Sequence, residues 1–148
     1  MGALWALACV VLHIFALSLR GDAHAEVIDL FNSMLAALSD DNVPGFMAAF
    51  DRDMPDYDKL KAQITALVDE ADIGSDVEPL KNEGDDTHRS VDLDWYLVIR
   101  SSVANGPSVQ RRQIVHCELR KEKKHWKIVA ISPLTFFAPA QFDSKSGQ

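Results

Sequence analysis

Residues 90–102, SVDLDWYLVIRSS, alternate between apolar and polar side chains with a period of two. This alternation is typical of a half-buried β-strand, because successive side chains of a strand point to opposite faces of its sheet. One face carries only apolar residues, which are Val91, Leu93, Trp95, Leu97 and Ile99. The other face carries Asp92, Asp94, Tyr96, Val98 and Arg100. We therefore predict the central strand of an antiparallel sheet, with ionisable side chains along one of its faces.

Three helices are expected before this strand. Apolar residues recur at helical spacing over residues 26–39, which predicts an amphipathic helix. Asn42 and Pro44 suit the start of a short second helix, because Asn caps helices and Pro costs little in the first turn. Asp56 can cap a third helix, which we expect to end at Gly74 because glycine commonly follows a helix C-terminus.

After the third helix the period changes to two, which predicts a meander of about four strands. Pro79 assigns the first of these strands, over residues 77–83, to an edge of the sheet. The other predicted segments are a turn over residues 84–86, a turn over 105–107, a strand over 109–122 and a strand over 126–132. Helices followed by such a meander predict an α+β fold in which three N-terminal helices pack on a curved antiparallel sheet.

The N-terminal segment has the composition of an export signal. Residues 1–19 contain no Asp, Glu, Lys or Arg, and residues 23–25, AHA, fit the small-x-small pattern of a signal-peptidase site. We predict a signal peptide over residues 1–25, a folded domain over 26–138 and a flexible tail over 139–148, in a periplasmic or extracellular protein. The alternative is an uncleaved membrane anchor, although the apolar run falls slightly short of the ~20 residues that span a bilayer.

Charge and cysteine content limit the classes of partner. Residues 26–94 carry 18 acidic and 5 basic side chains, whereas residues 95–148 carry 3 acidic and 9 basic ones. We expect the two halves to neutralise one another, and the net charge of −7 argues against binding nucleic acid. Cleavage of the signal would remove Cys9 and leave Cys117, which we predict to be a small buried residue. No Cys/His spacing indicates a zinc site, and we expect no cofactor.

Asp94 and His116 are the best acid–base pair that the sequence offers. The two strands that flank residues 105–107 could bring them together on one face, where the carboxylate would orient the imidazole. Tyr96 would then donate a hydrogen bond to a developing enolate.

Arginines on the same two strands offer a second kind of site. Arg100 and Arg112 could bind a carboxylate or phosphate ligand through bidentate contacts. The alternative for all of these residues is a solvated outer face, on which Asp92 and Asp94 form ion pairs with arginines of the neighbouring strand. Opposite charges on paired strands are routine, which favours this alternative.

Three segments resemble the nuclear transport factor 2-like superfamily, which includes ketosteroid isomerase, scytalone dehydratase and SnoaL-type cyclases. They are DLFNSMLAALSDDN, GFMAAFD and HWKIVAISP, with Phe46, Phe50, Trp126, Lys127 and Ile128 at the characteristic positions. The resemblance covers about residues 26–138. It implies a cone-shaped fold that encloses a pocket between the sheet and the helices. Members usually carry a β-hairpin where only residues 51–55 stand here, which implies a shorter sheet and a shallower pocket.

Three classes of function follow. The first, which we favour because of the missing hairpin, is a non-catalytic exported module that binds a small apolar or amphipathic molecule or a partner protein. The second is a cofactor-independent isomerase, dehydratase or cyclase that uses Asp94, His116 and Tyr96, and it requires these groups to meet in a closed cavity. The third is a subunit that dimerises through the sheet, and it requires an exposed apolar face centred on Val115, Cys117 and Leu119.

Overall fold

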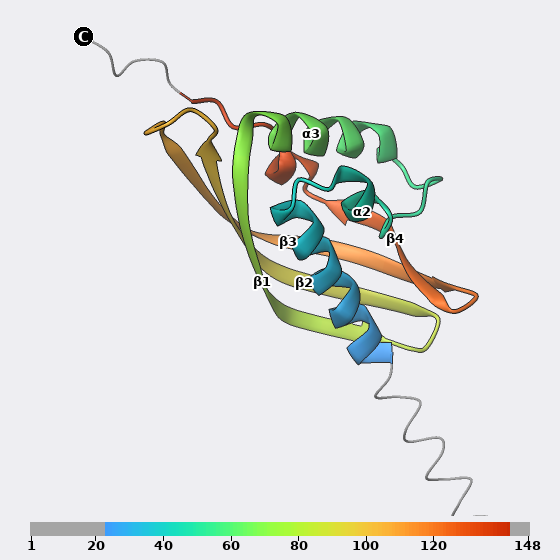
Figure 1. Cartoon of the computed structure of the whole chain (residues 1–148). Helices are drawn as coiled ribbons and strands as arrows, with labels where there is room; N and C mark the ends of the chain where they lie inside the picture. The colour runs from blue at the N-terminus through green and yellow to red at the C-terminus, as the bar shows by residue number, and fades with distance from the viewer. Residues whose placement is uncertain (1–22, 143–148) are drawn as a thin grey trace, which may run out of the picture.

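The computed structural model describes residues 23–142, which form one layer of helices on one antiparallel sheet (Figure 1). The first helix spans residues 23–39. The other elements are α2 (Val43–Met47), α3 (Tyr57–Glu70), β1 (Ala71–Gly84), β2 (His88–Ser101), β3 (Ser108–Glu122), β4 (His125–Ser132) and the 3-10 helix η1 (Leu134–Phe137). The strands are ordered β1-β2-β3-β4, and every neighbouring pair is antiparallel. The predicted α+β architecture, with three helices and four strands, is confirmed.

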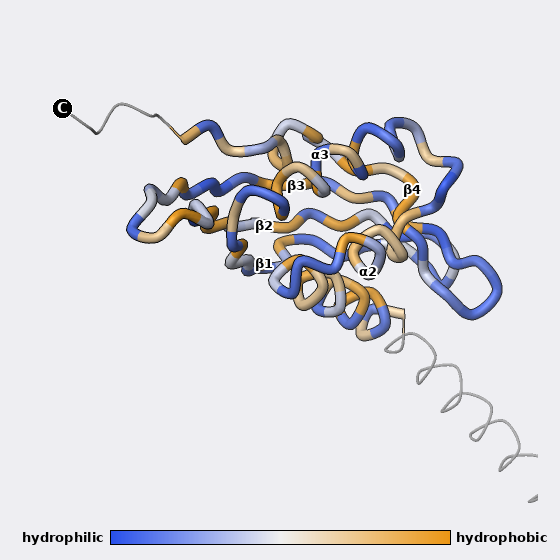
Figure 2. The backbone as a smooth tube through the Cα atoms, turned by 45° about the horizontal axis from the view of Figure 1, so that its top comes forward, coloured by the Kyte–Doolittle hydropathy of each residue, from blue (hydrophilic) through white to orange (hydrophobic). Residues whose placement is uncertain are grey.

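The central strand β2 directs its apolar face to the helices. Its five apolar residues on that face are all 0 % exposed, whereas its polar face is partly exposed along its length. Trp95 lies in the middle of the strand, and its indole Nε1 donates a hydrogen bond of 2.7 Å to Ser75 Oγ on β1. In Figure 2 hydrophobic stretches run along the strands of the sheet, and the hairpin loops on the right of the view are hydrophilic. The apolar face of the alternating strand is therefore the one that the helices cover.

The space between the sheet and the helices is filled by aromatic side chains. The Trp95 ring lies 5.1 Å from Phe137 and 6.0 Å from Phe136, measured between ring centroids. Phe46 continues this cluster, 6.0 Å from Phe137 and 5.5 Å from Phe50. Edge-on and tilted contacts of this kind are favourable beyond the burial of area. The pocket that the resemblance implies inside the cone is thus occupied by the chain's own side chains.

The boundary between α3 and β1 corrects the prediction for Gly74. The helix ends at Glu70, β1 begins at the next residue, and Gly74 lies inside β1 opposite Val98. Ile73 beside it is buried and pairs with Ile99. The physical reason is that pairing with β2 and burial of Ile73 outweigh the local preference of a glycine for a helix end. β1 is an edge strand as predicted, and its register shifts between Pro79 and Lys81.

The two predicted helix caps differ in outcome. Asn42 caps α2, because its Oδ1 accepts a hydrogen bond of 3.0 Å from the backbone N–H of Gly45. Asp56 is the N-cap residue of α3, as predicted, but its backbone is left-handed, with φ of 62°, and its side chain makes no capping hydrogen bond.

The β1–β2 turn follows the predicted residues 84–86. Gly84 has a φ of 138°, and a Cβ there would lie 2.2 Å from the carbonyl oxygen of His88, so only glycine fits. Asp85 Oδ1 accepts hydrogen bonds of 2.8 Å from the backbone N–H groups of Thr87 and His88. These bonds lower the pKa of Asp85 to about 2, because they stabilise the carboxylate.

The segment after β4 is held against the sheet by one arginine. The Arg111 guanidinium, on β3, donates to the backbone carbonyl oxygens of Phe136 at 2.9 Å and Pro139 at 3.2 Å, and also to that of Ala138. Ala140 beyond them is only 8 % exposed. Arg111 therefore holds η1 against the body and also anchors the first residues beyond it.

Two predictions concern the ends of the chain. The predicted signal lies outside the described residues except for residues 23–25, which here begin the first helix. The predicted tail lies outside them from residue 143 onward. Among residues 23–142, no helix has the length and apolar content needed to cross a membrane.

Candidate functional site

The residues predicted as a catalytic or anion-binding site lie on the outer face of the sheet. Asp94, Tyr96 and Arg100 come from β2, and Arg112 and His116 come from β3. The residues that alternate with them along β2, and along β3 from Val115 onward, are the buried ones that face the helices. These five residues therefore do not line an enclosed cavity.

Asp94 is paired with Arg112 and not with His116. The Arg112 guanidinium donates from Nε to Asp94 Oδ1 at 3.0 Å and from Nη2 to Asp94 Oδ2 at 2.6 Å. These hydrogen bonds lower the pKa of Asp94 and raise that of Arg112. The predicted acid–base pair is wrong, because the strand register places Ile114 opposite Asp94. The predicted alternative of cross-strand ion pairs describes Asp94 correctly.

His116 is held between two carboxylates. Its Nδ1 lies 2.5 Å from Asp92 Oδ1, and its Nε2 lies 2.6 Å from Glu118 Oε1. Ser90 Oγ donates to the same Glu118 oxygen at 3.1 Å. The hydrogen bond to Asp92 is the main cause that raises the pKa of His116. Partial burial of the imidazole lowers this pKa, and the hydrogen bond to Glu118 raises it further. An imidazolium that donates from both nitrogens has no lone pair with which to accept a substrate proton.

Stability is expected to depend on pH through this cluster. Because the folded-state pKa of His116 is raised, its contribution is fully present below the unfolded value of ~6.5 and is lost as the pH rises through the folded value. The side chain is 41 % exposed, so we expect His116→Gln to cost about 0.2–1 kcal/mol at pH 6. Urea unfolding of both proteins at pH 6 and pH 9 measures this difference. An equal difference at both pH values would contradict stabilisation by a protonated His116 bound between Asp92 and Glu118.

The hollow around Tyr96 is unsuited to an enolate. Asp76, Glu78, Asp94, Tyr96 and Arg112 line it, with a volume of about 290 Å³. Three carboxylates surround the phenol there, and the guanidinium is already bound to one of them. Negative charge developing beside Tyr96 would therefore be repelled.

The remaining residues that the sequence singled out are Arg100 on β2 and three apolar residues of β3. Arg100 is exposed near the end of β2, opposite Asp72 on one side and Ser108 on the other. Val115, Cys117 and Leu119 face the helices and are buried, so they form no exposed apolar surface. Burial raises the pKa of the Cys117 thiol, which keeps it protonated and unreactive.

Within residues 23–142, no His, Cys, Asp and Glu side chains gather in a group of three that could hold a metal ion.

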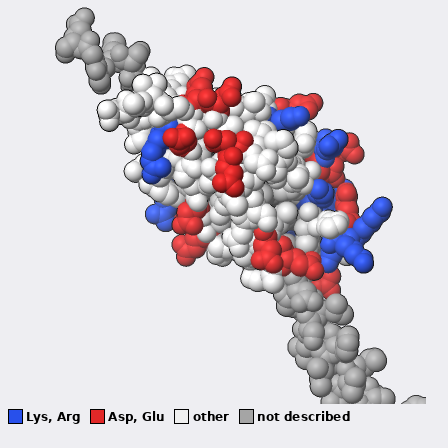
Figure 3. Space-filling model, viewed as in Figure 1, with Lys and Arg blue, Asp and Glu red and all other residues white. Residues whose placement is uncertain are grey.

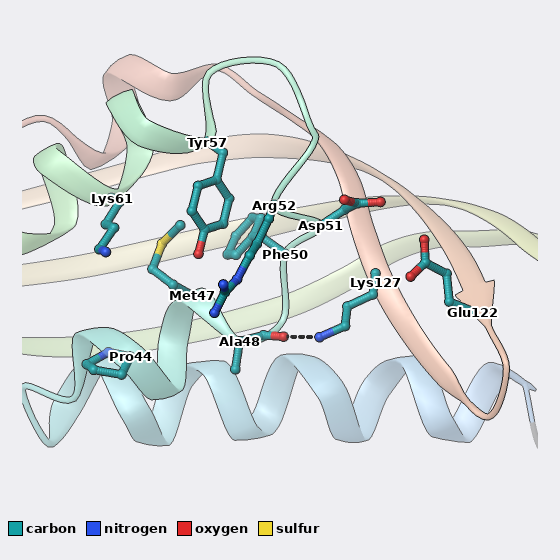
Figure 4. Close-up of a pocket in the computed structure, with 10 residues that line it drawn as sticks. All are labelled: Pro44, Met47, Ala48, Phe50, Asp51, Arg52, Tyr57, Lys61, Glu122 and Lys127. Atoms are coloured by element: carbon teal, nitrogen blue, oxygen red, sulfur yellow. Dashed lines mark hydrogen bonds between the residues drawn. The ribbon is translucent and has the colours of Figure 1, made fainter.

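The sequence analysis missed a cleft of about 520 Å³ at the end of α2 (Figure 4). We call it the α2–α3 cleft. It is lined by Pro44, Met47, Ala48, Phe50, Asp51, Arg52, Tyr57, Lys61, Glu122 and Lys127. These residues come from α2, the loop after it, the first turns of α3 and the β3–β4 hairpin. Two sequence signals pointed to this region: the loop over residues 51–55, at which the resemblance implied a missing hairpin, and the positions of Phe50 and Lys127.

The loop after α2 is fixed to β4 by a short parallel bridge. The Ile128 N–H donates to the Ala49 carbonyl at 2.8 Å, and the Asp51 N–H donates to the Ile128 carbonyl at 2.9 Å. Phe50 between them is buried and directs its ring toward Phe46. This bridge brings the floor of the α2–α3 cleft, formed by Met47 and Phe50, against the strand that carries Lys127.

The charged groups of the α2–α3 cleft are unevenly paired. Arg120 Nη2 on β3 donates to Asp51 Oδ2 at 2.8 Å and to Glu122 Oε1 at 2.6 Å, which satisfies both carboxylates of the lining. Lys127 Nζ donates to the Ala48 carbonyl at 2.5 Å. Arg52 and Lys61 have neither a hydrogen bond nor an ion pair from their side chains to any residue of the described part of the chain. Figure 3 shows basic side chains gathered at the side of the molecule where the β3–β4 hairpin lies, mixed with acidic ones.

Comparisons with known proteins identify the fold. The structure matches a conserved protein from Planctomyces limnophilus with a TM-score of 0.69 and 8 % identity, covering 76 % of this chain and 94 % of that one. It matches a putative scytalone dehydratase from Novosphingobium aromaticivorans with a TM-score of 0.65 and 12 % identity, covering 72 % and 79 %. An NTF2-like superfamily protein from Salmonella enterica gives a TM-score of 0.62 at 11 % identity, covering 86 % and 99 %.

These matches define an α+β cone with helices on one face of a curved sheet. The chain has the NTF2-like fold, as the sequence resemblance implied. No protein-family model matches the sequence, and no curated protein matches it. At these identities the comparisons establish the fold and not the chemistry, because one fold hosts many unrelated functions.

Proposed function

We propose that this protein is an exported, non-catalytic module that binds a small amphipathic molecule in the α2–α3 cleft. The observation that carries the proposal is the composition of that cleft, in which apolar side chains lie beside cations that have no partner within the described residues. Its volume of about 520 Å³ falls in the range of small-molecule sites. Residues 1–19 and the AHA sequence before Glu26 support export.

The alternative is a cofactor-independent isomerase or dehydratase. Such an enzyme needs an acid or base within hydrogen-bond reach of its substrate, in a site from which water is excluded. His116 and Asp94 are instead bound to neighbouring charges on the open face of the sheet. The alternative is supported by fold similarity to a putative scytalone dehydratase alone. The geometry of the α2–α3 cleft therefore favours binding.

The outer face of the sheet has the charged character of a solvent-exposed surface more than that of a dimer interface. Ile114 is exposed at its centre but is surrounded by the charges of Asp94, Arg112 and His116, which are already paired. A homodimer through this face stays a prediction.

Filling the α2–α3 cleft is expected to abolish binding. We choose 2-naphthoate as the probe, because it has an apolar body and a charged end. Ala48 lines the cleft with an exposed side chain, so Ala48→Trp can occupy the space without disturbing the core. We expect this change to weaken 2-naphthoate binding at least tenfold in isothermal titration calorimetry, with little change in the unfolding temperature.

Asp94→Asn is the matched control on the other candidate site. It removes the ion pair with Arg112 on the outer face, far from Ala48 in the fold, and should leave the affinity for 2-naphthoate within about twofold. Loss of binding in Asp94→Asn, or a measured turnover that this change abolishes in a folded protein, would overturn the binding-only proposal.

A further inference from the structure

We infer that the ligand of the α2–α3 cleft carries an anionic head group, a carboxylate on an aromatic or short aliphatic body, and that Arg52 and Lys61 bind it. This inference rests on the proposed function, because it names the class of molecule that the same cleft takes. Its starting point is the charge of the lining. Asp51 and Glu122 both accept hydrogen bonds from Arg120, whose single charge balances one of them, and the charge of Lys127, which is bound to a backbone carbonyl, balances the other. The positive charges of Arg52 and Lys61 are left for a ligand to neutralise.

The loop that carries Arg52 is fixed in place before any ligand binds. Asp51 Oδ1 accepts a hydrogen bond of 2.8 Å from the Asp53 N–H, and the Asp51 carbonyl accepts one of 3.1 Å from the Met54 N–H. These bonds close a tight turn around Arg52. The backbone bridge to Ile128 anchors the start of the same turn. Within this loop only the Arg52 side chain must be ordered when a ligand binds, which lowers the entropic cost of binding.

Lys61 and Tyr57 approach the cleft from α3. They are four residues apart in this helix, so their side chains lie on the same face of it. In the view of Figure 4 the Arg52 guanidinium lies below the Tyr57 hydroxyl, and the Met47 side chain lies between that hydroxyl and the Lys61 ammonium. The cleft thus presents two positive charges and a hydroxyl donor beside an apolar floor.

The chemistry of these groups indicates a carboxylate. A guanidinium offers a planar pair of N–H donors that match the two oxygens of a carboxylate, and the ammonium adds a point charge. Pro44 and Ala48 supply exposed apolar contact, and Met47 beside them is a residue type that adapts to rings and short chains of varied shape. Asp53 does not line this cleft but a neighbouring hollow beside Arg120.

The test compares two probes of the same shape, 2-naphthoate and the neutral 2-naphthamide, by isothermal titration calorimetry. The wild-type protein should bind 2-naphthoate about tenfold more tightly than the amide, as expected for charge-assisted hydrogen bonds. Arg52→Gln and Lys61→Gln should each weaken 2-naphthoate binding by about five- to tenfold and change amide binding less than twofold. Raising the salt from 50 to 500 mM should weaken only 2-naphthoate binding.

Lys59→Gln is the control, because Lys59 is an exposed lysine of the same helix that does not line the cleft. It should leave the affinity for both probes unchanged. If the two probes bound equally and Arg52→Gln changed neither affinity, the inference of an anionic head group would be overturned. The cleft would then be a site for neutral ligands. Absence of binding for both probes would overturn the proposed function itself. In each variant, an unchanged unfolding temperature confirms that the comparison is made between folded proteins.

Discussion

Phe137→Ala is expected to lower the free energy of unfolding by about 3–5 kcal/mol, the usual cost of deleting a buried phenylalanine ring. Phe137 is 0 % exposed and lies against Trp95, Phe46 and Phe136. Because domains of this size are stable by only about 5–15 kcal/mol, the loss is a large fraction of the total. Urea denaturation followed by Trp fluorescence measures it. Val103→Ala, at a residue that is 72 % exposed, is the control and should change stability by less than about 0.5 kcal/mol.

The same variant tests whether the interior of the cone is filled. Removing the ring leaves an apolar space among aromatic and aliphatic side chains, and such cavities bind benzene. Benzene should therefore raise the unfolding temperature of Phe137→Ala and leave that of the wild-type protein unchanged. If benzene stabilised the wild-type protein equally, an interior pocket would already exist, and the ligand would have a second place to bind.

Arg111→Met should destabilise the protein by about 2–3 kcal/mol, because a guanidinium that binds three backbone carbonyls is replaced by a side chain with no donor. The loss should fall on the segment from η1 to Ala140, which Arg111 holds against β3. We expect faster cleavage by a protease within residues 134–142, detected by mass spectrometry, together with a lower unfolding midpoint.

Arg112→Met is a closely matched control for this effect. Arg112 is the next residue of the same strand, but it lies on the outer face and binds only the Asp94 carboxylate. Exposed ion pairs contribute about 0–1 kcal/mol, so this change should be small and should leave proteolysis of the C-terminal segment unaltered. Equal effects of the two substitutions would contradict the role of Arg111 in anchoring η1.

The fold could be predicted because its central strand has an unambiguous pattern. The strict alternation from Val91 to Ile99 leaves one register for burial, and the opposite register would expose Trp95. The amphipathic first helix and the edge position of Pro79 follow from equally local rules. Gly74 was misassigned because its strand pairing depends on residues about 25 positions away in the sequence.

The predicted acid–base pair failed because of hairpin geometry. Asp92 and His116 are partners, and both are twelve residues from Ala104, which makes Ala104 the centre of the β2–β3 hairpin. A pairing of Asp94 with His116 would have needed a centre at Asn105. Moving the centre by one residue changes every cross-strand partner by two, and the sequence of the turn does not fix the centre that closely.

The α2–α3 cleft could not be predicted for a different reason. Its residues come from separate segments, and they meet because a single parallel bridge joins Phe50 to Ile128. One bridging residue produces no periodicity. Nothing in the sequence singles out Arg52 and Lys61, and only the structure shows that Asp51 and Glu122 bind Arg120 rather than these two residues.

The most direct test of ligand binding in the α2–α3 cleft is a titration of the ¹⁵N-labelled protein with 2-naphthoate, followed in two-dimensional ¹H–¹⁵N spectra. The predicted result is a set of shifts centred on the amides of Ala48, Arg52 and Lys61, with the indole signal of Trp95 unchanged. Shifts centred on the Trp95 indole would instead place the ligand inside the cone. Shifts centred on Tyr96 would place it on the outer face, and either result would contradict the α2–α3 cleft as the binding site.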